Sequence, residues 1–142
     1  MQGGPMPLPD DHEAAVFARE LDQYLANCEA VTLAIVTTPD GRLRAQRQRG
    51  AYETDLTAVM GSSLMALGDT ILAELRLGAC DTVIAESAQG LVLFNHIASA
   101  FVLVSMTQSK SSLGSLLSWA RRTADDIAQG LPLDKTVQST SA

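Results

Sequence analysis

The 142-residue sequence has few charged side chains, few aromatic side chains and only two cysteines. Charged residues make up 18%, below the roughly 25% usual in soluble proteins, so we expect a partner to cover part of the surface. Cys28 and Cys80 have no neighbouring cysteine or histidine, which indicates free thiols in a reducing cytoplasm. No uninterrupted apolar run approaches the roughly 18 residues of a membrane span, and no signal-peptide pattern is visible. We therefore expect a cytoplasmic protein without direct membrane insertion.

Motifs for chemistry are also missing. The sequence contains neither GxxxxGK[ST] nor GxSxG, the patterns of a phosphate-binding loop and of a serine nucleophile. His12 and His96 have no second ligand at metal spacing. The formal net charge of −6 argues against binding to nucleic acid. We therefore predict a protein that is not an enzyme, with no catalytic residues, no cofactor and no metal site.

What is present is a regular alternation of amphipathic helices and short apolar strands. The order α-β-β-α-β-β-β-α predicts an α+β fold, in which helices cover both faces of a five-stranded antiparallel sheet. We expect one domain over residues 10–130, between a flexible leader (1–9) and a flexible tail (131–142). The first helix is expected to start at Asp10 or Asp11, behind Pro9. The other expected elements are strands at 31–38 and 42–46, a helix at 54–77, strands at 81–86, 91–96 and 101–106, and a helix at 112–129.

The helix at 54–77 has two neighbouring apolar stripes. The first is expected to pack on the sheet and consists of Leu56, Met60, Leu64, Leu67, Ile71 and Leu75. The second consists of Gly61, Met65, Gly68 and Leu72. A glycine inside a helix costs about 1 kcal/mol relative to alanine, so close packing is the best explanation for two of them. We interpret the second stripe as a self-association surface; the alternative is a helix buried on both sides within one domain.

Two further features are candidates for binding a partner. The remaining face of the same helix is small and weakly charged, which suits contact with another protein, and carries Ser62, Ala66, Asp69 and Ala73. Four arginines follow one another on the second strand and the loop beyond it, at Arg42, Arg44, Arg47 and Arg49. An edge strand kept soluble by charge explains them better than a partner site does, although both interpretations stay open.

Taken together, these segments resemble a roadblock/LC7 domain over about residues 12–129. The resemblance is carried by TLAIVTTPDGRLRAQ, by the long small-residue-rich helix TDLTAVMGSSLMALGDTILAELRLG, and by the strands DTVIAESAQGLVLFNHI and FVLVSM. The last helix, SSLGSLLSWARRTADDIA, opens with the Leu113–Gly114 pair. The order and lengths of the elements support the resemblance more strongly than any single motif.

The resemblance implies a profilin-like, non-catalytic domain that homodimerises through the second helix and the third strand. On this chain the implied dimer surface is Gly61, Met65, Gly68, Leu72, Thr82 and Ile84. It also implies a small Ras-like GTPase bound on the helix-two side of the dimer. The partner-facing residues would be Ser62, Ala66, Asp69, Ala73, Arg47 and Arg49. A sensor kinase or another signalling protein is an alternative partner.

Two other classes of function compete with this interpretation. A ligand-binding sensory module of PAS or GAF type also combines an antiparallel sheet with helices. The sequence has only six aromatic residues and no polar anchors within its apolar runs, which disfavours an enclosed ligand pocket. An enzyme is disfavoured by the missing catalytic motifs.

Overall fold

The computed structural model describes residues 8–108 and 113–132, and its elements follow the predicted order. The helices are α1 (Leu8–Asn27), α2 (Asp55–Glu74) and α3 (Leu113–Gly130). The strands are β1 (Val31–Thr37), β2 (Leu43–Gln48), β3 (Thr82–Ser87), β4 (Gly90–Ile97) and β5 (Phe101–Thr107). The leader and tail expected at 1–9 and 131–142 fall largely outside the described residues. Helix α1 begins at Leu8, before Asp10 and Asp11, because Pro9 is compatible with the first turn of a helix.

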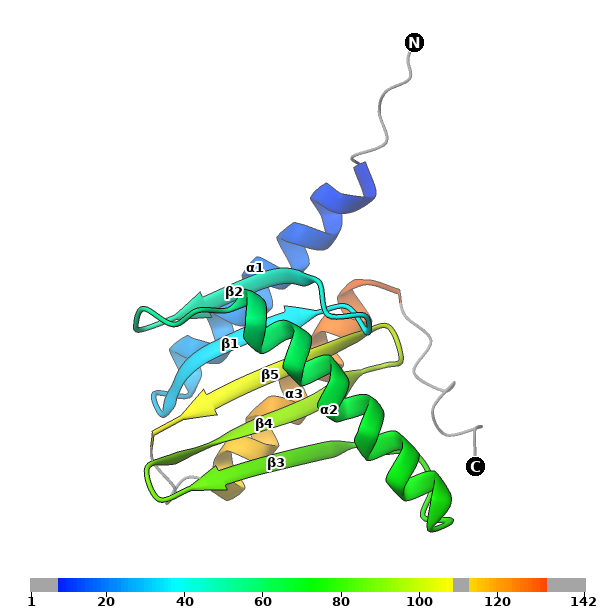
Figure 1. Cartoon of the computed structure of the whole chain (residues 1–142). Helices are drawn as coiled ribbons and strands as arrows, with labels where there is room; N and C mark the ends of the chain where they lie inside the picture. The colour runs from blue at the N-terminus through cyan, green and yellow to red at the C-terminus, as the bar shows by residue number, and fades with distance from the viewer. Residues whose placement is uncertain (1–7, 109–112, 133–142) are drawn as a thin grey trace.

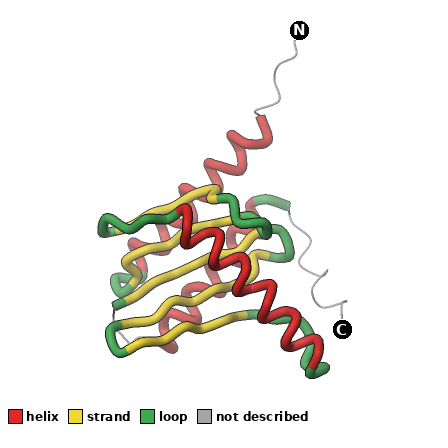
Figure 2. The backbone as a smooth tube through the Cα atoms, in the orientation of Figure 1, coloured by secondary structure: helices red, strands yellow, loops and turns green. Residues whose placement is uncertain are grey.

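The five strands form one antiparallel sheet in the order β2-β1-β5-β4-β3. Helices α1 and α3 lie side by side on one face, and α2 crosses the other face diagonally (Figures 1 and 2). The predicted α+β class, with helices on both faces of a five-stranded sheet, is confirmed. Strands β2 and β3 are the two edges of this sheet.

The hairpins join these strands through short turns. The β1–β2 connection contains the Pro-Asp-Gly sequence at 39–41, where Gly41 adopts a φ of +92° that a side chain would disfavour. Strands β3 and β4 are joined by two residues, Ala88 and Gln89, between the paired Ser87 and Gly90. These tight connections fix the register of each pair of strands and therefore which side chains share a face.

Apolar side chains fill the space on both sides of the sheet. The larger cluster lies between the sheet and helices α1 and α3, where the rings of Phe17 and Phe101 meet edge to face with centroids 5.2 Å apart. The smaller cluster lies between the sheet and α2, and its buried members are Leu33, Ile35, Ala58, Met65, Cys80, Phe94, Val102 and Val104. A single helix covers this second face, and it does so with only a narrow strip of its surface.

Candidate protein-interaction site

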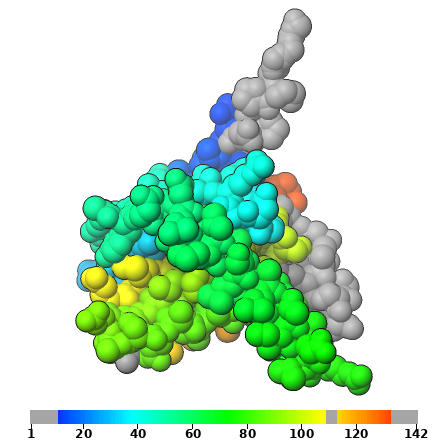
Figure 3. Space-filling view, in the orientation of Figure 1, coloured from blue at the N-terminus to red at the C-terminus, as the bar shows by residue number. Residues whose placement is uncertain are grey.

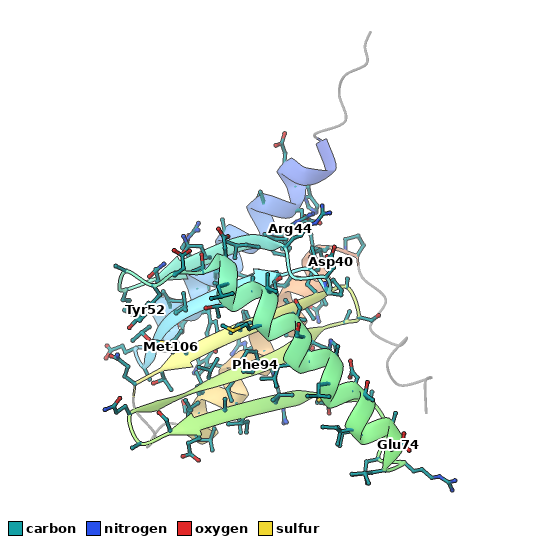
Figure 4. The ribbon with its side chains drawn as sticks, viewed as in Figure 1. Asp40, Arg44, Tyr52, Glu74, Phe94 and Met106 are labelled. Atoms are coloured by element: carbon teal, nitrogen blue, oxygen red, sulfur yellow. The ribbon has the colours of Figure 1, made fainter. Side chains whose placement is uncertain are left out.

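The glycine-containing stripe of α2 faces the sheet of its own domain. Met65 is only 1% exposed. A Cβ built on Gly61 would lie 3.2 Å from Cγ2 of Val104 and 3.3 Å from the ring of Phe94. Figure 4 shows Phe94 on the sheet beneath the helix. Gly61 therefore lets α2 approach the strands closely, and the close packing inferred from the glycines occurs within one chain.

Gly68, about two helical turns after Gly61, also faces the sheet. A Cβ built on Gly68 would lie 3.0 Å from Cγ2 of Val83 and 3.1 Å from Sγ of Cys80, and Leu72 packs against the same cluster. The predicted dimer surface on this helix is therefore wrong, because the residues assigned to it belong to the domain's own core or border it. These residues are Gly61, Met65, Gly68 and Leu72.

The stripe predicted to pack on the sheet is instead mostly exposed. Five of its six members are between 48% and 62% exposed, and they are Leu56, Met60, Leu67, Ile71 and Leu75. Only Leu64 packs partly against the core. Val59 and Leu77 add to the exposed apolar surface. Here too the prediction is wrong, because the small residues allow a closer approach to the sheet than a leucine stripe would.

By length and composition alone, α2 is also apolar enough to cross a membrane. In the folded chain its inward side belongs to the core, so the outward side is the feature that needs an explanation. The C-terminal end of α2 extends past β3 at the edge of the sheet, with Glu74 at its tip (Figures 3 and 4). Leu75 and Leu77, just beyond that tip, are 62% and 67% exposed. Large exposed apolar surfaces of this kind mark interaction sites.

The structure divides the residues predicted to contact a partner on α2. Ser62 is buried, and its hydroxyl donates to the carbonyl oxygen of Thr38 at 2.8 Å, so its assignment as a contact residue is wrong. Asp69 is half-buried and holds the helix to the sheet through His96 Nε2, 3.1 Å from its carboxylate. Ala66 and Ala73 are exposed and remain available for contact.

The arginines of β2 bind their own domain. Arg47 donates to Asp22 of α1 at 2.7 Å, and Arg44 forms an ion pair with Glu13 of the same helix. Arg49, the residue after β2, donates through Nε to the carbonyl oxygen of Val31 at 3.0 Å and through Nη2 to the carbonyl oxygen of Leu25 in α1. These contacts fasten α1 to the sheet edge and give Arg47 and Arg49 a structural role, whereas the sequence had also allowed a partner-binding one.

The two edges of the sheet differ in chemistry. Strand β2 carries charged side chains that α1 covers in part, which is a common way to prevent an edge from pairing with another chain. Strand β3 reads Thr-Val-Ile-Ala-Glu-Ser, with one charge, and Ile84 is 44% exposed. Thr82, the other predicted interface residue of β3, is half-buried and accepts a hydrogen bond from Asn95 at 2.9 Å. An apolar, uncovered edge thus lies beside the projecting end of α2.

Solved structures show what this arrangement is similar to. The gliding protein MglB from Thermus thermophilus superimposes with a TM-score of 0.73 at 14% identity, over 93% of this chain and 94% of that one. A roadblock/LC7 domain from Streptomyces avermitilis gives a TM-score of 0.73 at 16% identity, over 80% and 96% of the two chains. The chain has the roadblock/LC7 fold. Profilin IA from Acanthamoeba castellanii is similar more distantly, with a TM-score of 0.59 at 21% identity over 79% and 97%.

Sequence comparison adds nothing to this roadblock/LC7 likeness, since neither a family model nor a curated protein matches the chain. Within the described residues no group of three potential metal ligands comes together. Burial and, to a lesser degree, the nearby Asp69 carboxylate raise the pKa of the Cys80 thiol. A raised pKa favours the unreactive thiol form, so this cysteine reads as a core residue.

Sequence reasoning did not identify the outward apolar stripe of α2, which is the candidate site in the structure. The signal was present, because a helix with apolar residues on more than one face exceeds what a single sheet can cover. Residue size decides which of the two stripes faces the sheet. The glycine-containing stripe packs on the strands because its small residues let the helix backbone come close, and the stripe of large apolar residues stays exposed.

Proposed function

We propose that this chain is a non-catalytic, homodimeric regulator or scaffold that binds a small Ras-like GTPase in the cytoplasm and modulates its nucleotide cycle or localisation. The observation that carries the proposal is the outward apolar stripe of α2, formed by Leu56, Met60, Leu67, Ile71 and Leu75. The likeness of the chain's fold to a gliding protein and to a roadblock/LC7 domain supports the assignment.

The exposed surface divides into two parts along α2. The C-terminal part, with Leu67, Ile71 and Leu75, lies next to the uncovered edge strand β3. We assign this part to the contact between two copies, because a strand edge and a helix together offer backbone hydrogen bonds as well as apolar area. The N-terminal part, with Leu56 and Met60, lies toward the other edge of the sheet, and we assign it to the GTPase.

The first experiment measures self-association by light scattering at tens of micromolar. The wild-type chain is expected to have the mass of two copies. Ile71→Asp should give the mass of one copy while the circular dichroism spectrum stays unchanged, because a desolvated unpaired charge costs several kcal/mol. The matched control is Ala26→Asp on α1, an exposed position on the opposite face, which should stay dimeric. A wild-type mass of one copy would contradict the proposal.

The second experiment measures binding of the dimer to Ras-like GTPases from the same genome, each loaded with GDP or with a non-hydrolysable GTP analogue. Met60→Asp should remain dimeric and lose GTPase binding, whereas Ala26→Asp should retain it. The chain itself should bind no GTP in calorimetry. If the dimer binds none of these GTPases in either nucleotide state, the GTPase assignment fails even though the dimer stands.

A further inference from the structure

Strand β4 carries an asparagine on the face of the sheet where its other side chains are apolar. Leu91, Leu93 and Ile97 are buried in the cluster that faces α1 and α3. Asn95 lies on the same face, because side chains alternate along a strand, and it is only 3% exposed. A buried amide lowers the stability of a fold unless its polar atoms are hydrogen-bonded. Asn95 is thus a polar anchor within an apolar run, contrary to the sequence-based expectation.

The domain itself satisfies only half of this amide. Thr82, the neighbour of Asn95 on β3, accepts a hydrogen bond from Asn95 Nδ2 at 2.9 Å. The amide oxygen, Oδ1, is buried and has no partner among the described residues. Asn95 also lines a cavity of about 310 Å³ between the sheet and α3, which runs behind β4 in Figure 1. A hydrogen-bond donor held in this cavity would satisfy the amide oxygen.

Charged side chains of opposite sign border the same cavity. Asp81, just before β3, and Arg121 of α3 both line it, and within the described part of the chain neither forms an ion pair. The Thr82 hydroxyl adds a donor, because its oxygen accepts from Asn95 while its own proton can be donated. Asp125 lines the cavity as well, but it already has an interaction within the chain. The cavity therefore offers two acceptors and two donors, and each pair includes one charged group.

We propose that this cavity binds a free α-amino acid. The ammonium group of the ligand donates to Asn95 Oδ1 and to the Asp81 carboxylate. Its carboxylate accepts from the Thr82 hydroxyl and from the Arg121 guanidinium. A zwitterion uses both pairs of groups, whereas a plain cation would meet the guanidinium and a plain anion would meet the carboxylate. The volume of about 310 Å³ is at the lower end of the roughly 300–1,000 Å³ of small-molecule sites, which suits a ligand of this size.

This site is separate from the surfaces assigned in the proposed function. The cavity lies on the α3 side of the sheet, and the exposed apolar stripe of α2 lies on the other side. Binding of an amino acid therefore requires neither the GTPase contact nor the apolar contact of α2 with a second copy.

NMR titration of the purified full-length chain with the common L-amino acids, one at a time, tests the proposal. At least one should bind with a dissociation constant below about 1 mM and shift the amide signals of residues 81–82, 95–96 and 121–125. Two analogues of that amino acid serve as probes. Its amide lacks the carboxylate and its N-acetyl derivative lacks the ammonium group, so each should bind at least about tenfold more weakly.

Asn95→Leu separates a ligand-binding role of the amide from a structural one. The substitution removes the acceptor with little change in side-chain volume, so it should abolish binding. In the ligand-free chain the midpoint of thermal unfolding should stay the same or rise, because an apolar side chain replaces a half-satisfied buried amide. A lower midpoint together with unchanged amino-acid binding would show that the amide is structural and would overturn the proposal.

The two charged residues are exposed and distinguish the two ends of the ligand. Arg121→Gln should weaken binding of the amino acid about tenfold and leave binding of its amide unchanged, since the amide has no carboxylate. Asp81→Asn should weaken binding of both. The matched control is Arg122→Gln, at the next position of α3 and outside the cavity lining, which should bind like the wild-type chain.

Three results would overturn the proposal. The first is that no common L-amino acid binds at about 10 mM. The second is that the N-acetyl derivative binds as tightly as the amino acid. The third is that the amide binds as tightly, which would identify the N-terminus of a polypeptide as the ligand. None of these results alters the dimer or the GTPase contact, which light scattering and the GTPase assay test separately.

Discussion

The rotation of α2 on the sheet is tested most directly by comparing two neighbouring alanine substitutions, Met65→Ala and Leu67→Ala. Met65 is 1% exposed and lies in the cluster between helix and sheet, so its truncation removes buried atoms and leaves a cavity. Substitutions of this kind cost about 2–5 kcal/mol in the free energy of unfolding. Leu67 is 55% exposed, so less than half of its surface is buried within one chain. Truncating it to alanine should therefore lower the free energy of unfolding by only about 1 kcal/mol.

Protein concentration separates folding from dimerisation in this comparison. Urea unfolding is followed at about one micromolar and again at a concentration a hundred times higher. The loss from Met65→Ala should be similar at both, since it acts on each copy alone. Leu67→Ala should cost more at the higher concentration, because both copies lose an interface leucine. With the exposed half of each side chain counted, the dimer loses about 2 kcal/mol, or roughly 30-fold in its dissociation constant.

The reverse order of effects would refute this orientation of the helix. If Leu67→Ala lowers stability by several kcal/mol at both concentrations while Met65→Ala costs less than about 1 kcal/mol, then the leucine stripe faces the sheet. The glycine stripe would then be the free surface, and the proposed interface would have to be abandoned.

Three further outcomes follow from contacts around the C-terminal half of α2. Gly68→Val should destabilise the fold by about 1–3 kcal/mol in urea unfolding, because its Cβ would press on Val83 and Cys80, and an unchanged midpoint would contradict that packing. Asp69→Ala removes the contacts to His96 and to the Cys80 backbone N–H, so hydrogen exchange at 70–74 should accelerate while exchange at 55–62 does not. Because the folded state raises the pKa of Cys80, it holds the proton more tightly than the unfolded chain, and stability should fall as pH rises above the thiol's usual value of 9.0. Cys80→Ala should flatten that fall above pH 9.0, and an unchanged slope would show that other groups cause it.

The order of elements could be predicted from the sequence because each segment carries a local signal. Short apolar runs rich in β-branched residues, the Pro-Asp-Gly sequence between the first two strands and the amphipathic stripes of the outer helices all depend on neighbours in the chain. The boundaries that moved, such as the start of α1, depend on caps whose strength the sequence does not rank. The fold class therefore followed from the order of elements that these local signals define.

The site could not be predicted in the same way, because the orientation of α2 depends on three-dimensional fit. Its two apolar stripes are adjacent on the wheel, and hydropathy favours the leucine stripe for the core. Packing decides otherwise, since Gly61 and Gly68 bring the helix backbone close to Phe94 and Val83. Pairings between distant segments, such as Asp69 with His96, were equally out of reach, since they join residues far apart in sequence.

The two edges of the sheet differ in whether they can pair with another chain. A sheet that ends in two uncovered strands would pair at either side and could grow into a chain of copies. Here the arginines of β2 and their contacts to α1 close one edge, through Arg44 to Glu13 and Arg47 to Asp22. Only β3 is left open in the described sheet, so in the proposed dimer association through it stops at two copies. Removing the β2 charges should therefore leave the dimer intact and add higher oligomers, which sedimentation of an Arg44→Thr, Arg47→Thr variant would detect. A variant that remains strictly dimeric at high concentration would show that something other than these arginines closes the edge.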